Sequence, residues 1–317
     1  MRAKLLVGGI ILLIGIALIL VFFPASYVRV GYGGETSPEK IKISAMNRLE
    51  RNPFIIYYDK HNRSLAEEVA GILEQIWRIP QERLGLALGS FRVALIVPKE
   101  EATNWNGALI EMSLLETIFI WIGWQSPIFP LWFPYNVSTL QELGSMELFS
   151  IYWAIPHEAM ENSVVKKIYH DRSNRWIGDG LSEYVSFITS GELAPKVQAS
   201  ILRSRRLEIQ NLLELEENRT SYNLIEEFLY GTEREDRVEV AGYGVSLAFW
   251  LQIAQKHGEG VIKTFWQRLS QQGFPTAKEA ARILSELTGE DIWAKLQKMD
   301  LHEVLRTLEQ AGTLAQP

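Results

Sequence analysis

Two stretches decide the fold class: PHEAME at residues 156–161 and WIGDGLSEYVS at residues 176–186. Side chains four residues apart on a helix lie on one face, with Cβ atoms about 6 Å apart. His157 and Glu161 therefore have the spacing needed to hold one metal ion. Glu158 lies next to this pair and is angled away from it, where a carboxylate can take a proton from water during hydrolysis.

Asp179 is the candidate third ligand. It follows Glu161 by eighteen residues and falls in the predicted first turn of a second helix, with Glu183 one turn later on the same face. An Asp near a helix start also has a simpler role, as a cap or as a partner of the helix dipole. The HEAME string by itself favours an ordinary polar pair, because His302-Glu303 also occurs and has an arginine at the ligand position. The spacing of the two stretches together is what indicates a metal site.

Taken together, the two stretches resemble the gluzincin metallopeptidases of the peptidase MA clan, whose pattern is H-E-x-x-H followed by W-L-x-E-G-x-A-E-Y. NPFIIYYD (52–59) and FRVALIVPKE (91–100) resemble the short α/β region upstream of that family's site. AGYGVSLAFW (241–250) resembles its downstream helix, and residues 274–293 resemble its closing helices. The resemblance covers roughly residues 53–296.

This resemblance implies a role for each matching residue. His157 stands at the first zinc ligand and Glu158 at the general base. Glu161 stands where the family has its second His ligand, and Asp179 stands where it has a Glu ligand. Tyr243 stands near the family's transition-state tyrosine. The implied activity is hydrolysis of peptide bonds in a peptide or protein substrate by metal-activated water.

Two of the three ligand positions depart from the family pattern, which leaves two functions open. A His/Glu/Asp set carries one more negative charge than His/His/Glu, and its oxygens shift the preference from zinc towards harder ions such as Mn²⁺. The intact Glu158 favours a working peptidase that binds a divalent metal, with zinc ahead of Mn²⁺. The lost His favours an inactive pseudo-enzyme that keeps a groove for an extended peptide. His170 is a further alternative for the missing ligand.

The residue pattern predicts an α+β fold. NPFIIYYD and FRVALIV are typical of strands, and the helix between them is predicted to start at a capping box, Ser64–Glu67, and to end at Pro80. From residue 145 onward the pattern is mostly helical. The predicted helices include 195–215 and 222–230, and a second capping box is predicted at Thr276–Glu279.

The predicted organisation has four parts. Residues 1–24 form a transmembrane signal anchor and residues 25–51 a linker. Residues 52–140 form a small strand–helix–strand sheet region. Residues 141–312 form a mostly helical, zincin-like domain that carries the HExxE and WxxDGLxEY motifs.

The anchor is predicted from residues 5–23, which contain no polar side chain and follow Arg2 and Lys4. A helix of this length spans about 28 Å, close to the hydrocarbon thickness of a bilayer. The positive flank then keeps the N-terminus in the cytoplasm and makes the main domain extracytoplasmic, in a single-pass membrane protein. A cleaved signal peptide and a buried core helix are the alternatives.

The composition excludes several classes of site. The chain has 317 residues, 32 basic and 38 acidic side chains, a formal net charge of −6 and no cysteine. The acidic balance argues against nucleic acid as a partner. Without cysteine, any metal site has to be built from His and carboxylates. The aromatic segment 119–135 is open to two interpretations, a loop packed on the core or an interfacial patch.

Overall fold

The computed structural model describes residues 40–41, 46–96, 109–110, 128–132, 139–143, 148–168, 172–216, 218–229, 236–273 and 275–314. The chain divides into two compact units, one of residues 1–42 and 102–111 and one of residues 43–101 and 112–317. In the first unit the described residues form two short parallel strands, β1 (Lys40–Ile41) and β5 (Leu109–Ile110). The second, larger unit carries the candidate site.

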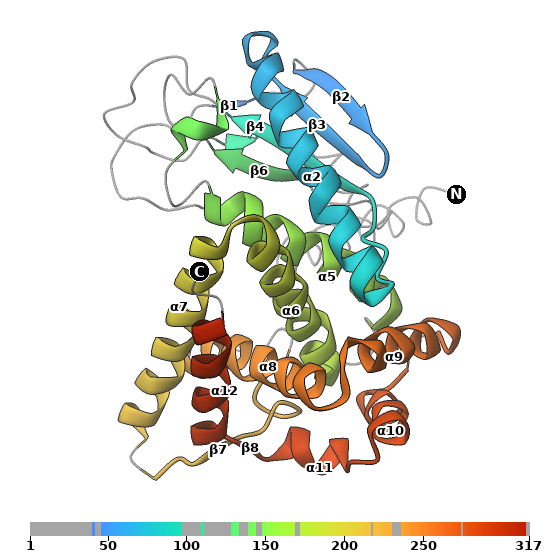
Figure 1. Cartoon of the computed structure of the whole chain (residues 1–317), viewed down its shortest axis with the longest axis vertical. Helices are drawn as coiled ribbons and strands as arrows, with labels where there is room; N and C mark the ends of the chain where they lie inside the picture. The colour runs from blue at the N-terminus through green and yellow to red at the C-terminus, as the bar shows by residue number, and fades with distance from the viewer. Residues whose placement is uncertain are drawn as a thin grey trace, which may run out of the picture. The chain divides into compact units, whose positions relative to one another are not determined.

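The larger unit contains a four-stranded sheet, ordered β2 (Asn47–Arg51), β3 (Phe54–Tyr58), β4 (Phe91–Ile96) and β6 (Ile128–Trp132). β2 pairs antiparallel with β3, whereas β3, β4 and β6 run parallel. Parallel neighbours need a crossover connection, and α2 (Arg63–Leu84) supplies it between β3 and β4 (Figure 1). The predicted strand–helix–strand region is therefore confirmed, and β2 forms within the segment that was predicted as a linker.

α2 packs on the sheet through a buried apolar stripe that includes Leu65, Val69, Leu73, Ile76 and Trp77. The Trp77 ring packs against side chains of two paired strands, with its centroid 5.4 Å from that of Phe54 and 5.9 Å from that of Phe91. Aromatic contacts of this kind bury large apolar areas, and burial is the main favourable term in folding. The sheet and α2 thus form one side of the hydrophobic core.

Both predicted ends of α2 are wrong. The helix starts at Arg63 with Asn62 as its N-cap, and the Glu67 carboxylate accepts a hydrogen bond from Arg63 Nε (2.9 Å) instead of closing a capping box. Pro80 lies inside the helix, which continues to Leu84, a residue that is fully buried in the core. The actual stop is Gly85, whose φ of 64° is the left-handed conformation that glycine adopts without strain.

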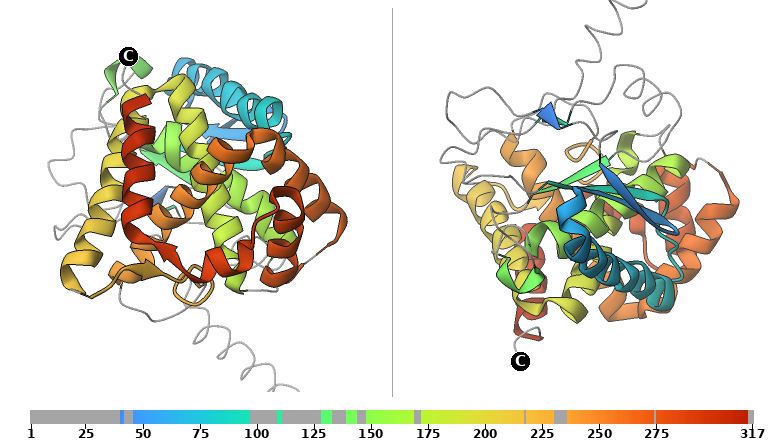
Figure 2. Two further views of the ribbon diagram at one scale, coloured as in Figure 1. Left: turned by 60° about the horizontal axis from the view of Figure 1, so that its bottom comes forward. Right: turned by 90° about the horizontal axis from the view of Figure 1, so that it is seen from above.

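The rest of the larger unit is mostly helical. A π-helical turn, η4 (Ser150–Ala154), leads into the helices α5 (Ile155–Ile168), α6 (Arg175–Leu193), α7 (Pro195–Leu215), α8 (Asp236–His257), α9 (Glu259–Gln271), α10 (Ala277–Thr288), α11 (Ile292–Gln297) and α12 (Leu301–Leu314). α6 contacts α5, α7 and α8, and α12 runs alongside α7 and α8 (Figures 1 and 2). Every residue of α6 from Arg175 to Ser186 is buried. α6 is thus the central helix on which the candidate site depends.

α6 and α8 cross closely at Gly180. A Cβ atom at this position would lie 2.9 Å from Ser246 Cβ and 3.1 Å from Trp250 Nε1. The close approach lets Trp250 Nε1 donate a hydrogen bond to the Trp176 carbonyl at 2.9 Å. The Gly that follows Asp179 is therefore needed for packing, and it holds α8 against the helix that carries the candidate ligand.

Two other predictions for the helical part have opposite outcomes. The capping box at Thr276 is confirmed, since its hydroxyl accepts from Glu279 N and the Glu279 carboxylate accepts from Thr276 N. The helix predicted over residues 222–230 is wrong. Ser221–Tyr222 forms β7, which pairs with β8 (Met299–Asp300), and turns follow. The Tyr222 side chain is fully buried there, and its hydroxyl donates to the Val238 carbonyl, so a contact distant in sequence decides the local structure.

The predicted fold class needs one correction. It included a transmembrane helix, and no helix in the described part of the chain is long and apolar enough to cross a membrane. Residues 5–23, on which that prediction rested, lie outside the described residues. The fold class is therefore a mostly helical α+β fold with a small sheet.

Candidate metal centre

The structure brings His157, Glu161 and Asp179 together between α5 and α6. His157 and Glu161 lie one turn apart on α5, as the i, i+4 spacing predicts, and Asp179 faces them from α6. His157 Nε2 lies 3.6 Å from Asp179 Oδ1 and 3.9 Å from Glu161 Oε2. One ligand atom from each residue lies within 4.8 Å of the other two. Three donors from two helices therefore converge on one point.

These donors fit a small divalent ion. Zinc binds His nitrogen and carboxylate oxygen at about 2.0–2.2 Å, so a tetrahedral ion places its ligand atoms about 3.3 Å apart. The donors have to close by roughly 0.3–1.5 Å per pair, which side-chain rotation can supply. One imidazole and two carboxylates are a donor set that Zn²⁺ accepts and that Mn²⁺ also suits.

His157 is oriented by Glu183, one turn beyond Asp179 on α6. His157 Nδ1 lies 3.1 Å from Glu183 Oε1, so Nε2 is the nitrogen that faces Asp179 and Glu161. Glu183 is itself fixed by Arg205 on α7, whose Nε and Nη2 donate to its two oxygens at 2.8 and 2.9 Å. A carboxylate that holds the far nitrogen of a ligating His is the usual outer support of a metal site.

Tyr243 on α8 and Arg175 on α6 complete the cluster. The Tyr243 ring lies 6.0 Å from the His157 ring, and its hydroxyl accepts a hydrogen bond from Arg175 Nη2 at 2.7 Å. Arg175 Nε donates to Asp179 Oδ2 at 2.7 Å, which leaves Oδ1 as the oxygen nearer His157. Burial, followed by the Asp179 charge, raises the pKa of Tyr243, so its hydroxyl stays protonated at neutral pH.

Burial and mutual repulsion control the ionisation of the carboxylates. Burial and the charge of Asp179 raise the pKa of Glu161 to about 7. Burial also acts to raise the pKa of Asp179, but the neighbouring His157 and the charge of Arg175 outweigh it, and this pKa is lowered. In the same way Arg205 and His157 outweigh burial and hold the pKa of Glu183 at about 2.

His157 is correspondingly stabilised in its charged form. Burial acts to lower its pKa, but the neighbouring carboxylates of Asp179 and Glu183 raise it well above the ordinary value. The surrounding charges therefore favour a cation at this point, either a proton or a metal ion.

Glu158, the predicted general base, is the exposed member of the cluster. It lies next to His157 at the start of α5. Desolvation by the surrounding protein raises its pKa, the His157 charge acts to lower it, and the Asp179 charge acts to raise it. An exposed carboxylate with a raised pKa is suited to accepting a proton.

Sequence reasoning found the three converging residues but not the cations that hold them. Arg175 and Arg205 were missed, although Arg175, Asp179 and Glu183 follow one another at i, i+4 and i+8 on α6. That spacing was the available signal for Arg175. Asp179 lies in the second turn of α6 because the helix begins at Arg175, earlier than predicted. His170 lies outside the described residues.

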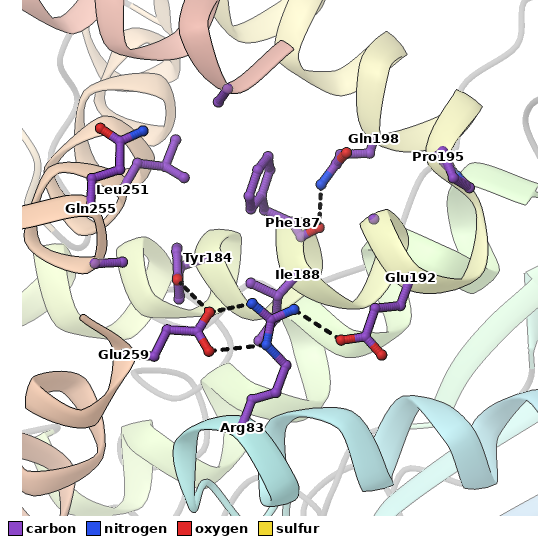
Figure 3. Close-up of a pocket in the computed structure, with 13 residues that line it drawn as sticks. Arg83, Tyr184, Phe187, Ile188, Glu192, Pro195, Gln198, Leu251, Gln255 and Glu259 are labelled. Atoms are coloured by element: carbon purple, nitrogen blue, oxygen red, sulfur yellow. Dashed lines mark hydrogen bonds and ion pairs between the residues drawn. The ribbon is translucent and has the colours of Figure 1, made fainter. Parts of the chain in front are cut away.

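A separate cavity of about 580 Å³ lies towards the other end of α6 (Figure 3). Arg83 on α2 donates to Glu192 (2.9 Å) and to Glu259 (3.0 Å), and Tyr184 also donates to Glu259 (3.0 Å). The charged side chains of this cavity are therefore paired with one another, and they tie α2, α6 and α9 together.

Comparison with known proteins returned structural matches alone. No family model matches the sequence, and no curated protein matches it. Two solved structures of native leukotriene A4 hydrolase from Saccharomyces cerevisiae align with 80% and 79% of this chain, at 10% and 9% identity, both with a TM-score of 0.49. The alignments cover 39% and 38% of the hydrolase, so this chain spans about two fifths of its length. A likeness at this TM-score carries no argument about function.

Proposed function

We propose that the chain is a metal-dependent peptide hydrolase of the zincin type, in which His157, Glu161 and Asp179 hold one divalent ion. The observation that carries this proposal is the convergence of these three donors within 4.8 Å. The sequence resemblance to gluzincin peptidases supports peptides as the substrate class. Zinc is the metal that this proposal favours, with Mn²⁺ as the alternative because two of the three donors are carboxylates.

Each residue of the cluster then has a defined task. A divalent ion held by His157, Glu161 and Asp179 would polarise the peptide carbonyl and make water more acidic. Glu158 accepts a proton from the attacking water and passes it to the leaving amine. Tyr243 donates a hydrogen bond from its hydroxyl to the developing oxyanion. Glu183 keeps His157 Nε2 facing the other two donors.

The proposal is tested by peptide cleavage with the purified chain. We expect cleavage of a mixed peptide library to stop when a chelator removes the metal and to return when zinc or manganese is added. A matched sample treated with the metal-saturated chelator controls for effects of the chelator itself. Cleavage that continues after complete metal removal contradicts a metal-dependent mechanism.

One observation favours a second function, that of an inactive peptide-binding relative. Arg175 already neutralises Asp179, at 2.7 Å, which gives the cluster an internal cation. The Glu161→His variant separates the two functions. Cleavage that appears only when His is restored identifies a chain that has lost catalysis, whereas cleavage by the unaltered chain identifies an enzyme.

Metal affinity is expected to rise with pH. The pKa of Glu161 is about 7 and that of His157 is raised, so below pH 7 both carry protons that an entering ion has to displace. Each displaced proton makes the affinity rise about tenfold per pH unit. Zinc titrations by calorimetry at pH 6, 7 and 8, in buffers of different ionisation enthalpy, measure both the affinity and the protons released. An affinity that is constant over this range contradicts the prediction.

A further inference from the structure

One guanidinium, that of Arg175, joins two residues of the candidate site, Asp179 and Tyr243, to Glu239. Its Nε donates to Asp179 Oδ2, its Nη2 to the Tyr243 hydroxyl and its Nη1 to Glu239 at 2.6 Å. The guanidinium carbon also lies 4.3 Å from the centroid of the Phe228 ring. The side chain is 6% exposed, so these contacts fix it in one position.

The contact with Asp179 decides which oxygen is available as a ligand. Arg175 occupies Oδ2, and Oδ1 is the oxygen that lies 3.6 Å from His157 Nε2. Asp is one methylene shorter than the Glu of the family pattern, so its carboxylate has less freedom to find the ion. A planar guanidinium with fixed donor directions can hold such a carboxylate in a single orientation.

The contact with Tyr243 decides the direction of its hydroxyl proton. A phenol oxygen that accepts a hydrogen bond from Arg175 has to direct its own single proton elsewhere. A second guanidinium, that of Arg205, lies 5.0 Å from the ring centroid of Tyr243 and confines the ring further. The hydroxyl is therefore an oriented donor, on a ring whose centroid lies 6.0 Å from that of His157.

The charge of Arg175 is its third contribution to the site. Glu161, at the position of a His, adds one negative charge to the ligand set, and Arg175 adds one positive charge in direct contact with Asp179. We propose that Arg175 is the positioning residue of this site: it fixes the ligand oxygen of Asp179 and the hydroxyl of Tyr243, and it offsets the charge that Glu161 adds. This inference rests on the proposed function.

The test separates the geometry of Arg175 from its charge. Arg175→Lys keeps the charge but loses the fork that reaches two partners at once. The matched control is Arg219→Lys, because Arg219 is also largely buried (10% exposed), pairs with Glu216 and Glu227 and lies 5.3 Å from the Tyr222 ring centroid, outside the site. A purely structural role predicts that both variants lose stability and that neither changes metal binding.

Zinc affinity, measured on the full chain by competition with a chromogenic chelator, is the readout. We expect Arg175→Lys to weaken zinc binding about tenfold or more, and Arg219→Lys to leave it unchanged. Glu239→Gln removes the charge of a carboxylate that holds Arg175, at a side chain that is 34% exposed. It is also expected to weaken zinc binding. This variant keeps the test valid if Arg175→Lys does not fold.

Tyr243 adds a kinetic readout. In the Arg175→Lys background, Tyr243→Phe is expected to reduce kcat by much less than it does in the unaltered chain, with little change in KM. Unchanged zinc affinity in both Arg175→Lys and Glu239→Gln overturns the positioning role while leaving the proposed function intact. An unaltered chain that binds neither zinc nor manganese overturns both.

Discussion

Replacing Glu158 by Gln is expected to lower kcat/KM for peptide cleavage by about 10²–10⁴-fold. The amide cannot accept a proton from water, whereas its size and hydrogen-bonding reach stay close to those of the carboxylate. Because Glu158 is not one of the three converging donors, zinc affinity is expected to stay at the value of the unaltered chain. The variant therefore separates proton transfer from metal binding.

The matched control is Glu303→Gln, because His302-Glu303 repeats the same dipeptide on α12. It lies outside the group of residues that converge on the candidate metal position. Activity and zinc affinity of this control are expected to equal those of the unaltered chain. A Glu158→Gln chain that cleaves peptides at the original kcat/KM contradicts the assignment of the general base.

Replacing Arg205 by Met is expected to lower the free energy of unfolding by about 3–5 kcal/mol. Arg205 holds both oxygens of Glu183, whose side chain is 1% exposed. Removing the guanidinium leaves a buried carboxylate whose remaining contacts are the Trp153 indole (3.3 Å) and His157. Burying a charge without its partner is among the largest costs that a single substitution causes.

Urea unfolding of the metal-free chain, followed by circular dichroism, measures this loss. Arg206→Met is the control on the same helix, since Arg206 pairs with Glu309 at the surface and surface pairs contribute about 1 kcal/mol or less. If the two variants unfold at the same urea concentration, the Glu183–Arg205 pair does not stabilise the fold around the site more than a surface ion pair does.

Much of the fold could be predicted where local signals and packing agree. α7 runs from Pro195 to Leu215, as predicted, because a proline at the first position suits a helix start. The α10 capping box forms as the Thr276–Glu279 spacing predicts. The predictions failed where contacts distant in sequence decide the structure. Pro80 stays within α2 because Ile79 and Leu84 on either side of it are buried. Tyr222 joins a strand because it pairs with Met299 and its hydroxyl bonds to the Val238 carbonyl.

Only part of the candidate site could be predicted, because only part of it depends on local sequence patterns. His157 and Glu161 are close because one helix carries both, which the i, i+4 rule states directly. Asp179 required a second helix to face the first, and the resemblance to the gluzincin pattern implied that arrangement. Arg205 comes from α7, so its pairing with Glu183 depends on the packing of α6 against α7, which no local pattern contains.

A zinc titration of the purified full chain at pH 7 tests directly whether His157, Glu161 and Asp179 form one metal site. We expect one zinc ion per chain, with manganese competing for the same site. We also expect Asp179→Ala and His157→Ala to abolish the binding, whereas Glu158→Gln retains it. No binding of either ion by the unaltered chain, or equal binding after Asp179→Ala, would rule out this site.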